Sequence, residues 1–348
     1  MTCFWRLFLS LVLAFLLNCS TTSAYSLPIV NTQVTASDFL SLGINNMQHG
    51  NYQEAIENFN QALQLQSDLA LAYSDRCQAY LELQDYHQAI TDCNHAINLA
   101  PDNFETYLSR GLARYRQGDD PAAIADYNQA IALQPVDFRA YYNRGLAHAG
   151  EKNYSKAIAD YNLALTQIPP TTSVFLADIY NDRGLAHLVL QNSPAAMLDF
   201  NRAIRLNGQD FRAYFNLGCA DGRNGNNAAA IRNFSQVIKL NPSHAPAYLN
   251  RGIAEYHLGY HQGAIADIKK ASEYFENQGK SISSQKTLDL LNKLRQQLQF
   301  VTAIALTPHA RDDDHQQALQ TGFQIHLSKP VNTEKLVAAI VRLVATGV

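Results

Sequence analysis

The sequence AYYNRGLAHAGEKNYSKAIADYNLAL, residues 140–165, decides how this chain folds, because close variants of it recur at a regular spacing. Each copy begins 34 residues after the previous one, apart from a single insertion at residues 172–176. A fixed period of this length indicates an array of equal structural units. Seven repeats can be aligned: residues 36–69, 70–103, 104–137, 138–171, 177–210, 211–244 and 245–278.

Each repeat has the residue pattern of two antiparallel helices joined by a tight turn. Counted from the first residue of a repeat, position 4 is always aromatic, position 8 is glycine or cysteine, and position 20 is always alanine. Small residues at positions 8 and 20 allow two helix backbones to approach closely, and the rings at position 4 and usually at position 24 fill the remaining space. The pattern therefore predicts a mainly α protein.

These positions resemble the tetratricopeptide repeat over residues 36–278. The resemblance implies a right-handed α–α superhelical solenoid, because no single repeat can bury its apolar face without a neighbour. Residues 279–299 follow the last repeat with leucines on one face and lysine or glutamine on the other. We expect this segment to form a helix that caps the array.

Positions 7 and 23 change together within repeats. Five repeats carry arginine and aspartate there, whereas the first and sixth carry leucine and asparagine. Unless this covariation is a coincidence, it predicts an ion pair between the two helices of one repeat, which would fix their orientation if it were bidentate and partly buried. The predicted pairs are Arg76/Asp92, Arg110/Asp126, Arg144/Asp160, Arg183/Asp199 and Arg251/Asp267.

In this family the first helices line a concave groove, and the resemblance places positions 2, 5, 6, 9, 12 and 13 on it. Position 6 is short and polar in every repeat, similar to the asparagine ladders with which some arrays of this family hold an extended peptide. A carboxamide both donates and accepts, so it matches a peptide group of any sequence. A solvated helix face with scattered rings is the alternative. The candidate groove residues are Asn143, Asn216, Asn250, Asp182, Tyr142, Phe215, Tyr115, Tyr256, Arg139 and Arg212.

The sequence offers little support for other kinds of activity. It contains no HExxH, GxSxG or P-loop motif, so we expect no catalytic residues, no metal site and no cofactor. The formal net charge is −3, and no block of lysine and arginine is present. A nucleic-acid partner is therefore not expected.

The N-terminus indicates export. Arg6 precedes the apolar run LFLSLVLAFLL, residues 7–17, which is too short for a comfortable membrane span. Cleavage after Ala24 would remove residues 1–24 as a signal peptide and leave residues 25–35 as a linker. Lipidation at Cys19 and an uncleaved anchor are the alternatives, and only these two would hold the chain at a membrane.

Three cysteines would remain after this cleavage: Cys77, Cys93 and Cys219. An odd number without CxxC spacing predicts neither a disulfide framework nor a metal site. Their places in the repeat favour buried small apolar residues.

Residues 300–348 depart from the repeat pattern. They contain two short apolar strands, each followed by a helical pattern, and this β-α-β-α series resembles the second half of a two-component receiver domain. In that family Thr307 would match the switch hydroxyl and Lys329 the lysine that contacts the phosphoryl group. No aspartate upstream can be assigned the role of phosphoacceptor, so we expect a truncated fragment without phosphotransfer activity.

These observations predict a non-enzymatic interaction scaffold that binds a protein or an extended peptide in its groove. The alternative is a signalling adaptor whose receiver-like tail engages two-component proteins. The first hypothesis requires an exported chain and the second a cytoplasmic one. The sequence predicts neither the identity of the partner nor the oligomeric state.

Overall fold

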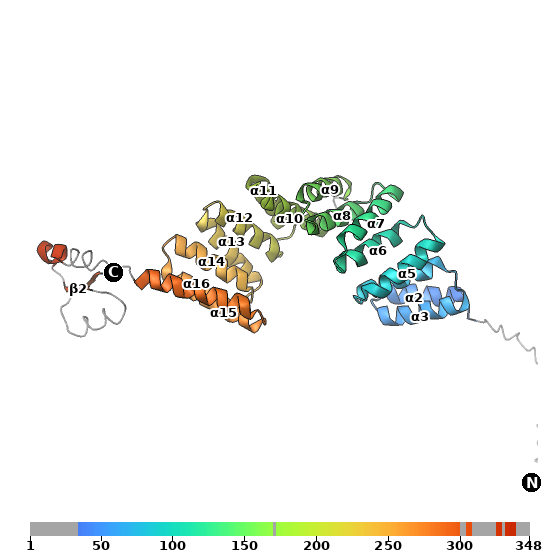
Figure 1. Cartoon of the computed structure of the whole chain (residues 1–348), viewed down its shortest axis with the longest axis horizontal. Helices are drawn as coiled ribbons and strands as arrows, with labels where there is room; N and C mark the ends of the chain where they lie inside the picture. The colour runs from blue at the N-terminus through green and yellow to red at the C-terminus, as the bar shows by residue number, and fades with distance from the viewer. Residues whose placement is uncertain (1–33, 170–171, 300–303, 308–324, 329–330, 339–348) are drawn as a thin grey trace, which may run out of the picture. The chain divides into compact units, whose positions relative to one another are not determined.

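The computed structural model describes residues 34–169, 172–299, 304–307, 325–328 and 331–338 (Figure 1). These ranges are mainly helical, as the sequence predicts. The chain divides into an N-terminal part, Met1–Pro101, and a C-terminal part, Asp102–Val348. The predicted signal peptide and nearly all of the predicted linker lie outside the described residues.

The N-terminal part contains the first two repeats as two helical hairpins. Helices α2 and α3 pack against each other, as do α4 and α5, and α3 also packs against α4. The helices are α2 (Ala36–Gln48), α3 (Tyr52–Leu65), α4 (Ala70–Glu82) and α5 (Tyr86–Leu99).

The C-terminal part contains the other five repeats and the expected capping helix, α16 (Ser281–Gln299), which packs against α15. First helices begin at the first residue of their aligned repeat except α10, which begins at Ser173, so the insertion lengthens this helix at its N-terminus. The hairpins are α6 (Phe104–Arg116) with α7 (Asp120–Leu133), α8 (Phe138–Gly150) with α9 (Tyr154–Gln167), α10 (Ser173–Val189) with α11 (Ser193–Leu206), α12 (Phe211–Arg223) with α13 (Asn227–Leu240), and α14 (Ala245–His257) with α15 (His261–Asn277).

The turn inside each hairpin is set by position 15, whose backbone is left-handed in all seven repeats. Glycine occupies it in four repeats, with φ between 77° and 84°. The other three have Gln84, Lys152 and Gln191, with φ of 60° to 62°. This conformation ends the first helix, and the chain then enters the second helix through an asparagine or aspartate in six of the repeats.

The two helices of a hairpin meet where position 8 faces position 24. A Cβ atom added to Gly145 would lie 2.6 Å from Cε1 of Tyr161, and one added to Gly111 would lie 2.6 Å from Cε1 of Tyr127. The ring therefore occupies the space that a side chain at position 8 would need. Both tyrosines are almost completely buried, with exposed fractions of 1% and 0%.

The second repeat uses a different contact at the same place, and the prediction about its cysteines is wrong. Cys77 at position 8 and Cys93 at position 24 form a disulfide, with their Cα atoms 5.5 Å apart. The bond replaces the glycine at position 8 and the residue at position 24, which is an aromatic ring in five of the other repeats and Ile268 in the seventh. The odd number of cysteines obscured this pairing, since only Cys219 is free among the described residues.

Arg144, at position 7 of the fourth repeat, connects both helices of its repeat with the preceding repeat. Arg144 makes two hydrogen bonds with Asp160, at 2.9 and 2.6 Å, and a third at 2.7 Å with Asn128 of the preceding repeat. Its guanidinium carbon also lies 5.7 Å from the centroid of the Tyr141 ring. The same ion pair joins Arg76 to Asp92, Arg110 to Asp126, Arg183 to Asp199 and Arg251 to Asp267, with shortest N–O distances of 2.6 to 2.7 Å.

The two repeats without this arginine show what replaces it. Leu217 of the sixth repeat is 6% exposed and belongs to an apolar cluster with Leu188 and Phe200. Asn233 at position 23 donates a hydrogen bond to Asp221 at 2.8 Å. Leu42 of the first repeat is 51% exposed, so a leucine here is not held in an apolar cluster as Leu217 is.

The tail is described only in short pieces. Strands β1 (Ile304–Thr307) and β2 (Ile325–Ser328) pair in parallel, and residues 333–338 are helical. Asn332 caps this helix, accepting a hydrogen bond from the Glu334 amide at 2.8 Å. Lys329 lies outside the described residues, so the receiver-like interpretation stays a prediction. Within the described ranges, no helix has the length and apolar character needed to cross a membrane.

Candidate functional site

The first helices α8, α10, α12 and α14 of the C-terminal part form one continuous face, because side chains connect each of them to the next. The Tyr142 hydroxyl on α8 donates to the Asp182 carboxylate on α10 at 2.8 Å. Asn216 on α12 donates to the Asn181 side chain on α10 at 2.9 Å. The amide of Asn250 on α14 lies 3.6 Å from the Cys219 sulfur on α12. We call this surface the α8–α14 face.

The predicted asparagines lie along this face with much of their hydrogen-bonding capacity unused. A carboxamide can donate two hydrogen bonds and accept two. Asn216 and Asn250 each use one donor in the contacts above, and within the described ranges the Asn143 side chain makes no hydrogen bond. All three side chains are half-buried, so their orientation is restricted while polar atoms still reach solvent.

Asp182 is held at the centre of this face. Burial raises the pKa of its carboxyl group, and the hydrogen bond from Tyr142 opposes that shift. Burial also raises the pKa of Tyr115, and the negative charges of Asp120 and Asp182 raise this pKa further. Asn181, which the sequence analysis did not select, contacts Asp182 at 3.4 Å and connects it to Asn216. The sequence could have indicated Asn181, because it stands at position 5 of its repeat, next to the selected position 6.

The predicted aromatic residues are packed rather than projecting. Phe215 lies against Phe234, with ring centroids 5.8 Å apart, and against His244 at 4.9 Å. Tyr256 lies against His261 at 5.3 Å. Both Phe215 and Tyr256 are half-buried and thus present only part of each ring to a ligand.

The two predicted arginines are already neutralised within the chain. Arg139 forms ion pairs with Glu105 at 2.6 Å and with Asp137 at 2.7 Å. Arg212 pairs with Asp210 at 2.8 Å and also with Asp178. These contacts raise the pKa of both guanidinium groups. The sequence analysis missed the acidic residues at position 2 of the preceding repeats, Glu105 and Asp178, so an anchoring role for either arginine has little support.

A hollow of about 340 Å³ lies between α12, α13 and α14. We call it the α12–α14 pocket. Phe234, Ile253 and Ala254 provide apolar surface, Gly218 and Gly222 lie on its α12 side, and Arg223 is among its polar lining residues. Cys219 also lines it, and burial raises the pKa of this thiol to about 11. A protonated thiol is a weaker nucleophile than a thiolate.

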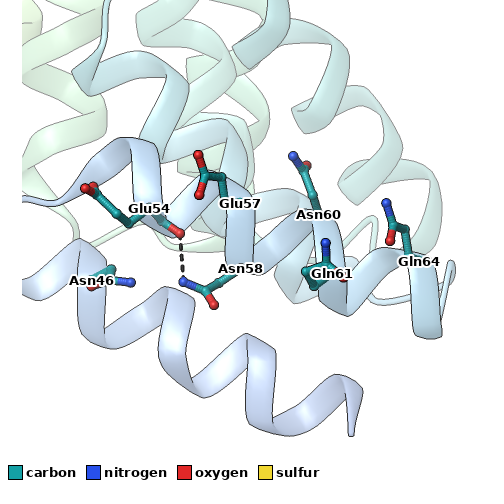
Figure 2. Close-up of a pocket in the computed structure, with 7 residues that line it drawn as sticks. All are labelled: Asn46, Glu54, Glu57, Asn58, Asn60, Gln61 and Gln64. Carbon is teal, nitrogen blue, oxygen red and sulfur yellow. Dashed lines mark hydrogen bonds between the residues drawn. The ribbon is translucent and has the colours of Figure 1, made fainter. Parts of the chain in front are cut away.

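A second hollow, of about 580 Å³, lies on α3 of the N-terminal part near the end of α2 (Figure 2). Its lining consists only of carboxamides and carboxylates: Asn46, Glu54, Glu57, Asn58, Asn60, Gln61 and Gln64. The Asn58 side chain donates a hydrogen bond of 2.7 Å to the backbone carbonyl of Glu54 in the same helix. Such a lining has no apolar anchor, and in the described part of the chain no cluster of histidine, cysteine or acidic residues is suited to a metal ion.

Sequence comparisons agree with the repeat pattern. Models described as TPR repeat and tetratricopeptide repeat match residues 47–84, 77–118, 111–150, 138–170 and 215–274, which together span more than half of the chain. No curated protein sequence matches the chain. The matches end before residue 300 and therefore do not test the receiver-like interpretation of the tail.

Solved structures share the fold at low sequence identity. A tetratricopeptide repeat protein from Parabacteroides merdae is 19% identical, with a TM-score of 0.56 over 74% of this chain and 98% of its own. The type IV pilus biogenesis factor PilW is 19% identical, with a TM-score of 0.56 over 63% of this chain and 98% of its own. PilF of Pseudomonas aeruginosa is 15% identical, with a TM-score of 0.54 over 62% and 96%. From its repeats and their arrangement, the chain belongs to the tetratricopeptide-repeat family.

Proposed function

We propose that this protein is an exported, non-enzymatic scaffold that holds an extended segment of a partner protein along the α8–α14 face. The family supports a role in protein–protein interaction, since its members bind proteins or peptides. The local geometry supports the choice of face. The absence of any recognisable catalytic motif in the sequence is consistent with a binding role.

The observation that carries this proposal is the chain of hydrogen bonds from Tyr142 through Asp182 and Asn181 to Asn216. It crosses three consecutive first helices and fixes polar groups before any ligand arrives. Fixed groups lose less conformational entropy on binding than mobile ones. Unused carboxamide donors and acceptors at Asn143, Asn216 and Asn250 can then bond to a peptide backbone whatever its side chains are.

Peptides selected from a random display library on the mature chain are expected to depend on these carboxamides. Replacing Asn143 and Asn250 together by alanine should weaken their binding at least tenfold, because each net hydrogen bond contributes about 1 kcal/mol. Fluorescence anisotropy of the labelled peptides measures the change in Kd.

A matched control removes two carboxamides elsewhere in the same part of the chain. Gln129 and Gln167 are exposed residues on α7 and α9, which are second helices. Their double replacement by alanine should leave the peptide affinity unchanged. Equal losses in the two double variants would overturn the proposed face, and a library that yields no binding peptide would overturn the proposed function.

Export is the second part of the proposal, and the mature N-terminus tests it. The apolar run at residues 7–17 and the small residues before Tyr25 support cleavage after Ala24. The Cys77–Cys93 disulfide supports it independently, because disulfides persist mainly in oxidising compartments. Intact-mass spectrometry of the purified protein is expected to show Tyr25 as the first residue. A lipidated Cys19 would change the proposal to a membrane-anchored protein, and an intact Met1 would contradict export.

The signalling-adaptor alternative gains no specific support. It depends on a tail whose Lys329 lies outside the described residues, and on a cytoplasmic location that the disulfide disfavours. The parallel pairing of β1 and β2 agrees with the predicted strand pattern but identifies no partner.

A further inference from the structure

The α12–α14 pocket exists because one side chain is missing from the repeat pattern. Position 12 carries a large side chain in five repeats, namely Met47, Leu81, Tyr115, Leu188 and Tyr256, and an alanine in the fourth. In the sixth repeat it is Gly222, which is exposed. A Cβ atom added there would meet only the Ala230 Cβ, at 3.9 Å, so the space is open.

The fourth repeat, which also has small residues in this region, shows that the opening is not general. There position 13 is Gly150, and a Cβ atom added to it would lie 2.3 Å from an oxygen of Asp120. A neighbouring carboxylate therefore occupies that space. Only the sixth repeat combines an open position 12 with a cation at position 13, Arg223, since the third repeat has Tyr115 before Arg116.

The lining of the pocket combines apolar side chains with one permanent cation, Arg223. The Phe234 ring is 2% exposed and Ala254 is 3% exposed, so each offers only a small, well-packed surface, and Ile253 adds to it. Arg223 and His257 lie at exposed positions on the last turns of α12 and α14. No carboxylate lines the pocket, and unlike Arg139 and Arg212, Arg223 has no ion pair with any described residue.

We infer that this pocket receives a bulky apolar side chain from the partner segment, with an acidic residue next to it held at Arg223. The inference rests on the proposed function, because the segment must lie along the α8–α14 face to reach the pocket. The volume of about 340 Å³ is sufficient for one large side chain. Asn250 links the two sites, because it lines the pocket and also belongs to the proposed row of carboxamides.

The peptides selected on the mature chain test this inference. They are expected to share an aliphatic or aromatic residue followed or preceded by aspartate or glutamate. Gly222→Tyr restores the side chain of the third and seventh repeats and should weaken these peptides about tenfold or more by filling the pocket. Gly222→Leu is a smaller second variant, and circular dichroism confirms that each variant folds.

Arg223→Gln separates the charge from the shape. This substitution should weaken the binding of acidic peptides about threefold to tenfold. The binding of versions with glutamine in place of the acidic residue should not change. Arg205→Gln, on the exposed surface of α11, is the matched control and should change neither.

Two results would overturn the inference while leaving the proposed function intact. One is a set of peptides that depends on Asn143 and Asn250 but binds Gly222→Tyr as well as the wild type. The other is selection of basic or small side chains at the pocket. If no peptide binds at all, both the inference and the proposed function fail. If the wild type self-associates and Gly222→Tyr abolishes this self-association, the occupant of the pocket is a second copy of this chain. That result would also overturn the inference.

Discussion

Replacing Arg144 with leucine is expected to destabilise the C-terminal part by about 3–5 kcal/mol. The substitution leaves Asp160 without its bidentate partner while its side chain stays buried, with 4% of the residue exposed. It also removes the hydrogen bond to Asn128 and the contact with the Tyr141 ring. His148 lies 3.9 Å from Asp160, but burial lowers its pKa, so it is a poor substitute for a permanent cation.

The chain itself supplies the compensating change. The first and sixth repeats have leucine at position 7 together with asparagine at position 23. The double variant Arg144→Leu/Asp160→Asn reproduces this pair and is expected to recover most of the lost stability, because no charge remains buried. Guanidinium unfolding followed by circular dichroism measures both variants.

An exposed ion pair provides the control for the Arg144 experiment. Lys269 and Glu273 lie 3.9 Å apart on α15 with side chains at least 60% exposed. Lys269→Leu should change the free energy of unfolding by less than about 1 kcal/mol. If Arg144→Leu had an equally small effect, or if the double variant were as unstable as the single one, the structural role assigned to the arginines would be wrong.

The contact between positions 7 and 23 of a repeat was predictable from the sequence because seven repeats sample the same environment. The pattern at positions 7 and 23 pointed to five pairs, and the structure places all five in contact. Helix starts were equally regular, and only the insertion before Ala177 shifted one of them. A position that has the same neighbours seven times shows its constraint in a single sequence.

Contacts between repeats were harder to predict because each one occurs once or twice. The pairing of Glu105 with Arg139 and of Asp178 with Arg212 joins position 2 of successive repeats, and no comparison within a repeat reveals it. The α12–α14 pocket was missed for a related reason. It is made by the absence of a side chain at Gly222, and residue types alone do not show which neighbours leave that space empty.

Reduction of the Cys77–Cys93 disulfide is expected to lower the free energy of unfolding of the N-terminal part by about 3 kcal/mol. The two cysteines are 16 residues apart, and closing a loop of this size restricts the unfolded chain by about that amount. The reduced pair also leaves two small side chains where other repeats have a buried ring. Thermal unfolding of the mature chain with and without dithiothreitol, followed by circular dichroism, measures the difference.

The repeat pattern predicts how to make the fold independent of oxidation. Cys77→Gly/Cys93→Tyr places the residues of the third and fourth repeats at positions 8 and 24, so this variant should be stable and insensitive to dithiothreitol.

Conversely, Gly145→Cys/Tyr161→Cys should form a disulfide in the fourth repeat, detectable as a loss of free thiols. If the first variant were unfolded under all conditions, positions 8 and 24 would not be interchangeable between repeats.

A wild-type protein that is equally stable when reduced would remove the disulfide as support for export, and the mass of the mature N-terminus would then be the only test of the compartment. Because the glycine–ring contact works without oxidation in the other repeats with an aromatic at position 24, a cysteine pair at this one place is useful only where the bond can form. A measured loss of stability on reduction would therefore make the N-terminal part most stable in an oxidising compartment, as the proposal of export expects.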